Sequence, residues 1–448
     1  MSSSPATPSV AAGRLSAAEY QRNFADAHPP LTPVQALLEA ERCYYCYDAP
    51  CTTACPTGID IPSFIARIAQ GNLRGAAHGI LAENVLGGMC ARVCPTEVLC
   101  EQACVRNTQE DKPVEIGLLQ RHATDAYFAK PGAPLFTRAA PSGKRVAVVG
   151  AGPAGLSCAH RLAMLGHEVT LFDDKPKLGG LNEYGLATYK TVGGFAQQEV
   201  DWLLSIGGIT VRPNHSLGRD MHLDALTRDY DAVFLGLGLA GVNTLGIAEP
   251  ANAAARPAVD FIAELRQADS PAAVPVGLKV VVIGGGMTAV DAAVQSRLLG
   301  ADEVTIVYRR GPDAMSASGY EQQWAQRNGV TIRHWAAPEQ MLLADGRVQG
   351  VRFARTALQD GRLVRTGEQF ELAADMVLTA IGQMFEAQPL GVALSLQDGR
   401  IATDAEGRTS HPKVWAGGDC RAGGRDLTVE AVQDGKVAAH AIDNALRA

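Results

Sequence analysis

The sequence predicts an α/β protein in which a cysteine-rich α-helical region precedes two Rossmann-like nucleotide-binding units. Eight of its ten cysteines fall between residues 43 and 104. Two later stretches, 145–172 and 279–310, each read as a buried strand, a glycine-rich turn, a helix and a second strand. That order is the βαβ pattern of nucleotide-binding sheets. A linker rich in Pro and Gly, at 130–143, separates the two kinds of sequence.

Length, charge and hydropathy restrict the class of protein. The 448 residues are enough for about three domains. The net charge is −7 and no basic run occurs, which argues against a nucleic-acid partner. No apolar stretch is long enough to cross a bilayer, and the N-terminus lacks the apolar segment of a secretory signal. We therefore expect a cytoplasmic protein without a membrane partner.

The region before residue 130 shows only helical signals. Thr32 followed by Pro33 reads as a helix start, with threonine as the N-cap and proline at the first helical position. Residues 61–84 show helical periodicity interrupted by glycine, and 114–128 show an amphipathic pattern. These segments place the cysteines on short helices and the loops between them.

The cysteine spacing indicates iron–sulfur chemistry. Both runs of cysteines contain a Cys-Pro-Thr step, which resembles the spacing of bacterial ferredoxins. The eight thiols, which could hold two [4Fe–4S] clusters, are Cys43, Cys46, Cys51, Cys55, Cys90, Cys94, Cys100 and Cys104. Disulfides would need an oxidising compartment. Zinc is the stronger alternative, but zinc sites usually show two Cys-x2-Cys knuckles, and this sequence has one.

The first βαβ unit carries a dinucleotide-binding motif. Gly150, Gly152 and Gly155 follow the first strand and open the helix, where they permit a tight turn and a close approach of pyrophosphate. Asp173 ends the second strand, where an acid can bind ribose hydroxyls. We expect the neighbouring Asp174 to point to solvent.

The second βαβ unit carries a variant of the motif. It reads Gly284, Gly285, Gly286, Met287, Thr288, and then alanine at the place of the third glycine. The next strand ends in Arg309 and Arg310 rather than in an acid, and arginines there can hold the 2′-phosphate of NADPH. The alternative is a solvated basic turn, so both NADH and NADPH stay open.

Further residues resemble FAD-binding flavoproteins that have two dinucleotide domains. Pro153 and Ala154 inside the first motif are typical of them, and residues 415–419 (WAGGD) resemble their second signature. The resemblance implies that Gly418 and Asp419 contact FAD. It also implies that Thr428 and Val429 start a helix whose amides face the flavin pyrimidine. Within the same resemblance, the turn next to the nicotinamide is formed by Ala380, Ile381 and Gly382.

A redox-active disulfide is excluded. No cysteine lies between Cys158 and Cys420, whereas a reductase of the thioredoxin-reductase type needs a cysteine pair within reach of the flavin. We expect Cys158 to be a buried helix residue and Cys420 to be inert.

Nearly the whole chain from about residue 35 resembles the family of the glutamate synthase small subunit and the N-terminal half of dihydropyrimidine dehydrogenase. The segments CYYCYDAPCTTACPTGIDIPSFI, GGMCARVCPTEVLCEQAC and PVEIGLLQRHATDA favour the pyrimidine branch. Glutamate synthase small subunits usually read Cys-Pro-Ala-Pro-Cys-Glu-x-x-Cys at the second cysteine run. Within the family, the chain is most similar to bacterial subunits of the PreT type.

The resemblance implies a particular ligand set. Cluster 1 would use Cys43, Cys46, Cys51 and Cys104. Cluster 2 would use Cys55, Cys94, Cys100 and the side-chain oxygen of Gln120. Cys90 would then be a spare thiol. An oxygen ligand of this kind can tune the potential of a cluster.

The resemblance also extends the FAD site. It adds Leu156, Gly180, Leu181 and Lys190, the last as a basic residue near the flavin. The alternative for Lys190 is a solvated loop lysine.

The resemblance implies an N-terminal α-helical iron–sulfur domain followed by two Rossmann-like domains. Residues 1–141 would bind two [4Fe–4S] clusters, the discontinuous 142–241 and 383–448 would bind FAD, and 242–382 would bind NADH or NADPH. The chain would pass electrons from NAD(P)H to a separate PreA-like subunit that contains FMN and iron–sulfur clusters and reduces uracil or thymine. No side chain need be a catalytic acid or base, because the cofactors carry the chemistry. The alternatives are a glutamate synthase small subunit or related reductase subunit, and a non-catalytic iron–sulfur module that binds a partner.

Overall fold

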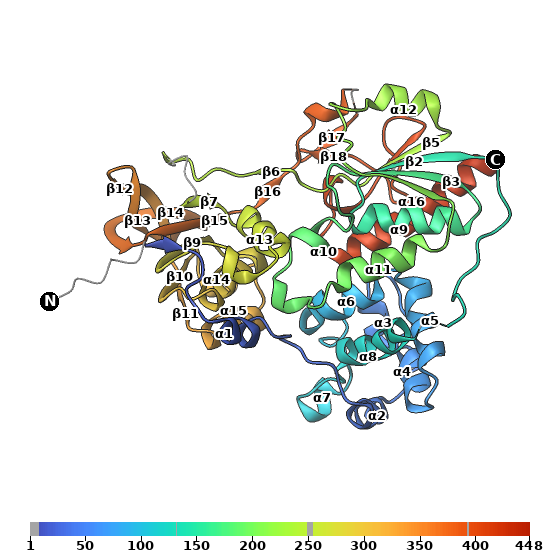
Figure 1. Cartoon of the computed structure of the whole chain (residues 1–448), viewed down its shortest axis with the longest axis horizontal. Coiled ribbons are helices and arrows are strands. Elements are labelled where there is room, and N and C mark those ends of the chain that lie inside the picture. The colour runs from blue at the N-terminus through green and yellow to red at the C-terminus, as the bar shows by residue number, and fades with distance from the viewer. Residues whose placement is uncertain (1–8, 131, 249–253, 392–393) are drawn as a thin grey trace. The chain divides into compact units, whose positions relative to one another are not determined.

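A computed structural model of the chain describes residues 9–130, 132–248, 254–391 and 394–448 (Figure 1). The described residues form two compact units. The cysteine unit contains 28–183, 193–241 and 384–448, and the interposed unit contains the described parts of 1–27, 184–192 and 242–383.

The N-terminal part of the cysteine unit is built from short helices. Their bounds are α2 Pro33–Glu41, α3 Pro50–Ala54, α4 Ile61–Ala69, α5 Leu73–Glu83, α6 Gly87–Val93, the 3₁₀ turn η1 Thr96–Val98, α7 Asn107–Glu110 and α8 Ile116–Ala129. Helix α2 begins as predicted, because the Thr32 hydroxyl accepts a bond from the Gln35 amide and the Gln35 side chain accepts one from the Thr32 amide. Helices α2, α4, α5 and α8 enclose one apolar core, against which Cys43, Cys51, Cys55, Cys100 and Cys104 pack.

The second part of the cysteine unit is a parallel five-stranded sheet. In spatial order its strands are β19 Val414–Ala416, β5 Ala232–Leu235, β2 Arg145–Val149, β3 Glu168–Phe172 and β4 Ile209–Arg212. Its helices are α9 Pro153–Met164, α10 Leu181–Tyr184, α11 Phe195–Leu204, α12 Leu223–Asp229 and α16 Thr428–Arg447, with the 3₁₀ turn η6 Gly418–Cys420. A small hairpin joins β17 Leu396–Gln397 to β18 Arg400–Ile401.

Helices α9 and α16 lie side by side (Figure 1), although they are far apart in the sequence: α9 ends at Met164 and α16 begins at Thr428. A Cβ atom at Gly435 of α16 would lie 2.1 Å from the Ala154 carbonyl oxygen of α9, so only glycine permits this approach. The sheet is therefore assembled from sequence on both sides of the interposed unit, which confirms the predicted discontinuous Rossmann-like fold.

The interposed unit holds a second parallel sheet. In spatial order its strands are β11 Val330–Arg333, β10 Glu303–Val307, β9 Lys279–Gly284, β15 Met376–Ala380 and β7 Ala255–Pro257. Its helices are α13 Ala258–Gln267, α14 Met287–Leu298 and α15 Gly319–Arg327, and short 3₁₀ turns include η2 Thr188–Lys190. An antiparallel sheet follows, formed by β12 Ala336–Ala344, β13 Arg347–Gln359 and β14 Arg362–Ala373. The short strands β6 Gly241–Val242 and β16 Gln383–Met384 pair where the chain enters and leaves this unit.

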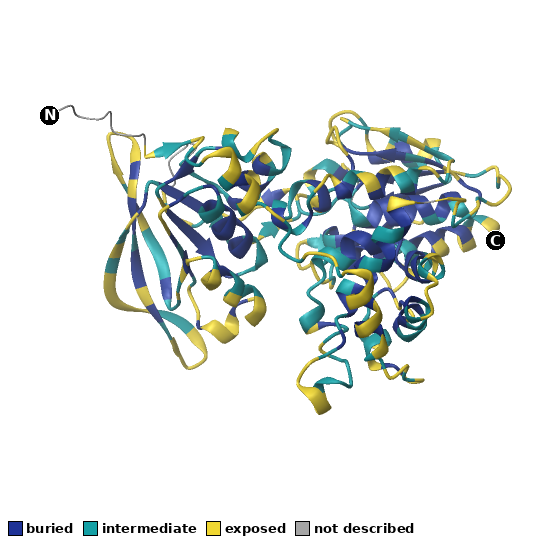
Figure 2. Ribbon diagram, turned by 60° about the horizontal axis from the view of Figure 1, so that its bottom comes forward, coloured by how far each residue is buried: buried dark blue, intermediate teal, exposed yellow. Residues whose placement is uncertain are grey.

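The two sheets of the interposed unit differ in how far their strands are buried. Strand β9 is buried along all but its first residue, whereas β14 is mostly exposed (Figure 2). A parallel strand whose two faces are both covered by other elements reads as a continuous apolar run, as Val280–Ile283 does.

Residues 9–27 belong to the interposed unit, whereas the prediction from the sequence placed them in the cysteine-rich domain 1–141. Strand β1, Val10–Ala11, pairs with β8, Val276–Gly277, and helix α1, Ala17–Asn23, buries Tyr20 in the core of that unit. Besides the backbone pairing and the buried ring, Arg14 donates to the Val276 carbonyl and Asn23 to the Leu298 carbonyl, each at 3.0 Å. None of these contacts leaves a periodic pattern in the sequence.

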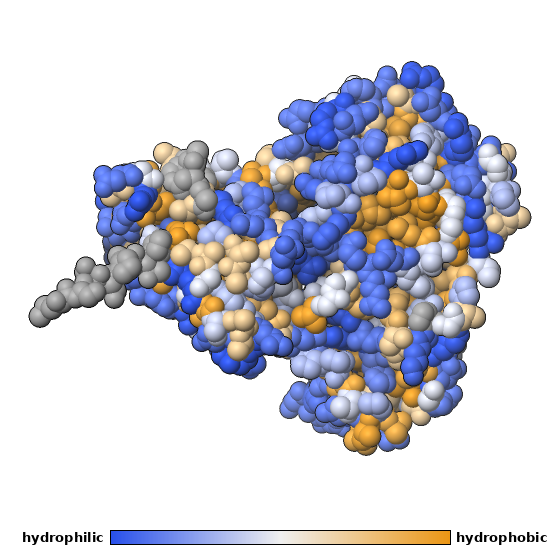
Figure 3. Space-filling model, viewed as in Figure 1, coloured by the Kyte–Doolittle hydropathy of each residue, from blue (hydrophilic) through white to orange (hydrophobic). Residues whose placement is uncertain are grey.

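The surface of helix α2 carries exposed apolar side chains. Val34, Leu37 and Leu38 are all more than 40% exposed, and Figure 3 shows apolar atoms at the lower edge of the view, where Figure 1 places α2. Within the described ranges, every helix is too short or too polar to cross a membrane.

Candidate functional site

The predicted ligands of cluster 1 lie together in the cysteine unit. Cys43 follows the end of α2, and Cys51 lies in the first turn of α3. Burial raises the pKa of Cys43, and the thiols of Cys46 and Cys104 raise it further. Burial and the thiols of Cys43 and Cys104 raise the pKa of Cys51 to about 11. These effects connect Cys43 with Cys46, Cys51 and Cys104, so the predicted ligands of cluster 1 lie in one region of the unit. The fold thus brings together side chains as far apart in the sequence as Cys43 and Cys104.

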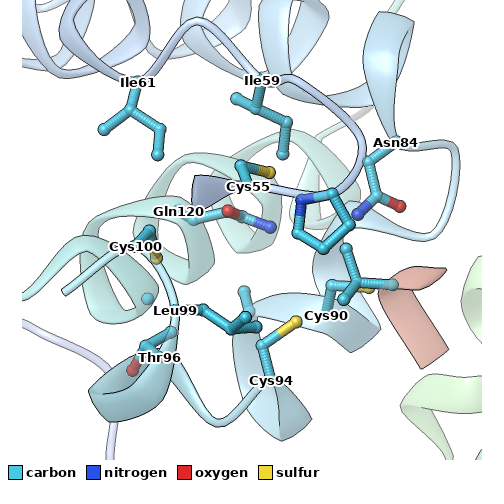
Figure 4. A pocket seen from close by; sticks show the side chains of 14 residues that line it. Cys55, Ile59, Ile61, Asn84, Cys90, Cys94, Thr96, Leu99, Cys100 and Gln120 are labelled. Carbon is cyan, nitrogen blue, oxygen red and sulfur yellow. The ribbon is translucent and has the colours of Figure 1, made fainter. Parts of the chain in front are cut away.

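The predicted ligands of cluster 2 surround a pocket in the same unit (Figure 4). Cys55 directly follows α3, Cys94 directly follows α6, and Cys100 follows η1. A hydrogen bond with Cys90 and then burial raise the pKa of Cys94, and the thiols of Cys100 and Cys55 act in the same direction. Burial raises the pKa of Cys100 above its usual value. Metal ligation needs thiolates, and a bound cluster would supply the positive charge that stabilises them here.

Both candidates for the fourth ligand line this pocket. The Gln120 side-chain nitrogen donates to the Gly87 carbonyl at 2.7 Å, which leaves the amide oxygen as the atom available to the pocket. Cys90 is 2% exposed and packs against Leu99 and Val429. The assignment of Gln120 as ligand and Cys90 as spare thiol remains a prediction.

The chemistry of the side chains suits iron–sulfur clusters. Several of the predicted ligands pack against one core, and Cys55, Cys94 and Cys100 line one pocket. Thiolate sulfur is the ligand that holds [4Fe–4S] clusters in proteins. The side chains present therefore fit this kind of group.

The first glycine motif joins β2 to α9 and fits a dinucleotide. Gly152 caps α9, and a Cβ atom there would meet only the Cα of Gly180, at 3.8 Å. The helix N-terminus is thus open for an anion. A Cβ at Gly150 would lie 2.2 Å from the Gly236 carbonyl oxygen, and one at Gly155 would lie 1.8 Å from the Gly150 carbonyl oxygen. These two glycines make the tight turn possible.

Asp173 lies beside this turn, as predicted. Its carboxylate accepts hydrogen bonds from the amides of Ala151 at 2.6 Å and Lys175 at 2.8 Å. Burial raises the pKa of Asp173, and the two amide bonds act against that shift. Asp174 is exposed, as we expected.

The C-terminal signature reaches the same region. A Cβ at Gly418 would lie 3.0 Å from the Cβ of Ala154, so η6 packs directly against the start of α9. Burial raises the pKa of the adjacent Asp419 to about 6, and Asp426 adds to this shift. Thr428 donates to the side chain of the buried Asn182 at 3.1 Å. Gly152, Gly180, Gly418 and Thr428 therefore come from four separate segments of one unit.

Val429 connects this region to the cysteines. It occupies the first turn of α16, its side chain is 2% exposed, and it lines the cluster 2 pocket with Cys90 and Leu99. The sequence predicted only a contact between its backbone and the flavin. In the structure the same residue borders the second cysteine group.

The second dinucleotide motif lies in the interposed unit. Gly284 ends β9 and pairs in register with Ala380 at the end of β15, so the two predicted NAD(P) segments are neighbours. Gly286 caps α14, and a Cβ at Gly285 would lie 2.4 Å from the ring of Tyr308. Arg309 and Arg310 follow β10 and are exposed, so they remain candidates for a 2′-phosphate.

Lys190 also lies in the interposed unit. Its ammonium forms ion pairs with Asp291 at 2.8 Å and Glu321 at 2.9 Å, and its side chain is 11% exposed. Burial alone would lower the pKa of Lys190, but the two carboxylates raise it above its usual value. The alternative of a solvated lysine is therefore wrong. Its predicted contact with FAD remains a prediction.

Sequence reasoning missed several residues around these groups. Asp434 accepts from the Gly418 amide at 2.9 Å, and its two oxygens accept from Nε and Nη2 of Arg421. These bonds hold the η6 turn. Asn84 and Glu199 are buried beside the cysteines. All three are polar residues in ordinary helical contexts, so only their three-dimensional neighbours mark them. Cys158 is fully buried in α9, as expected, and Cys420 is fully buried as well.

Two family models match the chain. Residues 20–131 match the model described as dihydropyrimidine dehydrogenase domain II, 4Fe–4S cluster. Residues 144–435, more than half of the chain, match the model described as pyridine nucleotide-disulphide oxidoreductase.

Similar curated proteins extend over nearly the whole length. The NAD-dependent dihydropyrimidine dehydrogenase subunit PreT of Salmonella typhimurium is 33% identical, over 95% of this chain and 98% of that protein. The glutamate synthase [NADPH] small chain of Escherichia coli K12 is 34% identical, over 94% and 93%. The putative oxidoreductase UacF of the same strain is 34% identical, over 97% and 71%.

Solved structures show the same fold. FprA of Mycobacterium tuberculosis in complex with NADPH has a TM-score of 0.56 at 19% identity, covering 68% of this chain and 85% of that one. The thioredoxin reductase of T. acidophilum has a TM-score of 0.52 at 21% identity, covering 67% and 98%.

These matches confirm the expected cofactors: [4Fe–4S] clusters, FAD and a nicotinamide dinucleotide. The two cysteine groups, the two glycine turns and the near full-length relatives all indicate the same family. The chain belongs to the family of NAD(P)H-dependent iron–sulfur flavoprotein oxidoreductase subunits that includes PreT and the glutamate synthase small chain.

Proposed function

We propose that this chain is the electron-input subunit of a dihydropyrimidine dehydrogenase. It would oxidise NADH or NADPH and deliver electrons to a PreA-like partner, with FMN and iron–sulfur clusters, that reduces uracil or thymine to the 5,6-dihydropyrimidine. The observation that carries the proposal is Val429, which lies in the first turn of α16, at the predicted flavin site, and whose buried side chain lines the cluster 2 pocket. The backbone of this residue would thus face the flavin, and its side chain borders the second cysteine group.

The proposed roles follow the geometry of each segment. When bound, the flavin accepts a hydride and the clusters carry single electrons. The open N-terminus of α9 and the carboxylate of Asp173 would bind and orient the FAD dinucleotide. The N-terminus of α14, capped by Gly286, would orient NADH or NADPH in the same way. Apolar packing around Val429 and Leu99 would exclude water between flavin and cluster.

The ligand and domain assignments remain part of the proposal. Residues 1–141 would form the cluster domain, 142–241 with 383–448 the FAD domain, and 242–382 the NAD(P) domain. Residues 9–27 are an exception to the proposed cluster domain 1–141, because they pack in the interposed unit.

The pyrimidine assignment is supported by the second cysteine run. Five residues separate Cys94 from Cys100, and this second cysteine run resembles the pyrimidine branch rather than the glutamate synthase small subunits. In addition, the chain matches PreT over 98% of the length of PreT. A glutamate synthase small subunit is the second candidate, because that relative is as similar in identity.

Anaerobic reduction tests the electron-input role. We expect the purified chain, loaded with FAD and both clusters, to lose its flavin absorbance on addition of NADH or NADPH, with reduced-cluster EPR signals appearing next. An artificial one-electron acceptor should then sustain NAD(P)H oxidation. If the flavin stays oxidised with both nucleotides, the electron-input role is contradicted, and the alternative of a non-catalytic iron–sulfur module is favoured.

Reconstitution with a partner tests the substrate. The chain alone should not reduce uracil, whereas the chain with an FMN-containing PreA-like subunit should convert uracil to dihydrouracil. Co-purification with a large amidotransferase subunit, and glutamine-dependent glutamate formation, would contradict the pyrimidine role and favour the second candidate.

A further inference from the structure

The side chain of Asn84 presents an unpartnered donor to the cluster 2 pocket. Asn84 follows the last residue of α5 and is fully buried. It lines the pocket with Cys55, Cys94 and Cys100. Its side-chain nitrogen is buried without a hydrogen-bond partner in the structure. A buried amide left unpaired is destabilising because it has lost its hydrogen bonds to water, so an orphaned donor of this kind calls for an acceptor.

The other polar atoms of Asn84 are already bonded. Its amide donates to the Ile80 carbonyl at 2.9 Å, and its carbonyl accepts from Gly87 at 2.9 Å. Its side-chain oxygen accepts from the Leu86 amide at 3.1 Å. This last bond fixes the orientation of the carboxamide, because a flipped group would set its N–H against the Leu86 N–H. In Figure 4 the nitrogen of Asn84 accordingly lies on the side of the pocket.

Two carboxamides therefore reach one pocket with opposite polarity. Gln120 uses its nitrogen on the Gly87 carbonyl and has its oxygen available. Asn84 uses its oxygen on the Leu86 amide and has its nitrogen available. An iron atom takes an oxygen ligand, whereas a sulfide or a thiolate sulfur accepts an N–H. The pair is thus complementary to the two kinds of atom in an iron–sulfur cluster.

We infer that Asn84 donates a hydrogen bond to a sulfur of cluster 2 and raises its reduction potential. The inference rests on the proposed ligands of that cluster. Reduction adds negative charge to the cluster, and a donor held at its sulfurs stabilises the reduced form more than the oxidised form. Asn84 is therefore a positioning and tuning residue, and none of its atoms ligates iron.

Two variants remove the donor in different ways. Asn84→Asp keeps an oxygen for the Leu86 amide and replaces the nitrogen, while Asn84→Leu keeps a similar volume without charge. Asn72→Asp is the matched control, because Asn72 caps the opposite end of α5, is exposed, and accepts from the Gly75 amide at 2.9 Å. It adds the same charge as Asn84→Asp far from the pocket and keeps the cap.

EPR-monitored redox titration of the holoprotein provides the measurement. At a fixed potential, both Asn84 variants should lower the ratio of reduced to oxidised cluster 2 about tenfold, which is about 59 mV for a one-electron couple. Cluster 1 and the Asn72→Asp control should be unchanged. Pulsed EPR in D₂O should show an exchangeable proton coupled to cluster 2 in the wild type and not in Asn84→Leu.

Each contrary result has a distinct meaning. A retained cluster 2 with unchanged potential and proton coupling in both variants would overturn the inference alone. Loss of the cluster from both variants would also overturn it, because Asn84 would then serve only to hold the loop. Absence of a second cluster from the wild-type chain would overturn the proposed ligand set together with the inference.

Discussion

The Glu199 side chain is fully buried where α11 meets α6. Its two oxygens accept hydrogen bonds from the amides of Gly88 at 2.7 Å and Met89 at 3.1 Å, at the start of α6, the helix that Cys94 directly follows. A Cβ atom at Gly88 would lie 2.8 Å from the carboxylate, so glycine allows this approach. Glu199 thus connects an element beside the nucleotide sheet to the helix that carries a predicted ligand.

Burial raises the pKa of Glu199 to about 8, while the two amide bonds and Arg92 oppose the shift. A carboxyl group whose pKa is higher in the folded state loses stabilisation as pH rises from its unfolded value, near 4.5, through 8. We predict that Glu199→Gln flattens the fall of Tm between pH 5 and pH 9. The pH-dependent part of the free energy of unfolding that this substitution removes is on the order of a few kcal/mol. Thermal unfolding across that pH range is the measurement. The exposed Glu168→Gln should follow the wild-type curve, and a parallel curve for Glu199→Gln would contradict the assignment.

At the scale of elements, α16 holds the two halves of the cysteine unit in one piece. It packs on α9 through Gly435, and its first turn reaches the cysteine pocket through Val429. Further along, the ammonium of Lys436 donates to the Thr57 carbonyl at 2.8 Å and pairs with Glu83 at 2.9 Å. One helix therefore contacts the predicted flavin turn and the loop that follows Cys55.

We predict that Gly435→Ala separates α16 from α9. The added methyl would lie 2.1 Å from the Ala154 carbonyl oxygen and 2.9 Å from the Cys158 amide, both of them backbone atoms that cannot rotate away. Overpacking of this kind costs about 1–3 kcal/mol. We expect a lower Tm and weaker retention of FAD, measured by flavin absorbance after gel filtration. Gly319→Ala, which meets nothing within 4 Å, should change neither.

At the scale of the whole molecule, each unit has its own apolar core. The core of the interposed unit includes Tyr20 from α1 and the strands β9, β10 and β15. The cysteines pack against a separate core formed by α2, α4, α5 and α8. Because the cores are separate, damage to one unit should leave the chemistry of the other unchanged.

We predict that Tyr20→Ala loosens the interposed unit alone. Tyr20 is 4% exposed, and loss of a buried ring costs about 3 kcal/mol or more. Limited proteolysis should cut within 242–383 sooner than in the wild type, while the cluster EPR spectra stay the same. Loss of the cluster signals together with faster cleavage would show that the two units unfold as one.

Much of the fold and of the candidate site could be predicted because it depends on near neighbours in sequence. The strand predicted at 145–149 is β2, the helix predicted at 114–128 is close to α8 at Ile116–Ala129, and the Thr32 cap forms as expected. Glycine turns are local in the same sense, because the positive φ of Gly150 is a property of one residue and its flanking strand and helix.

The fold class, the two βαβ units and the iron–sulfur character of the cysteine runs could be predicted from sequence alone, because periodicity, turn chemistry and ligand spacing act over a few residues. The place of residues 9–27 in the interposed unit, in contrast, depends on tertiary packing. That packing alone placed Lys190 between Asp291 and Glu321, and it alone directed the Asn84 nitrogen and the Glu199 carboxylate towards the elements that carry the cysteines. These placements depend on packing between segments far apart in sequence, and the energy of a buried polar contact is set by partners that no local pattern specifies.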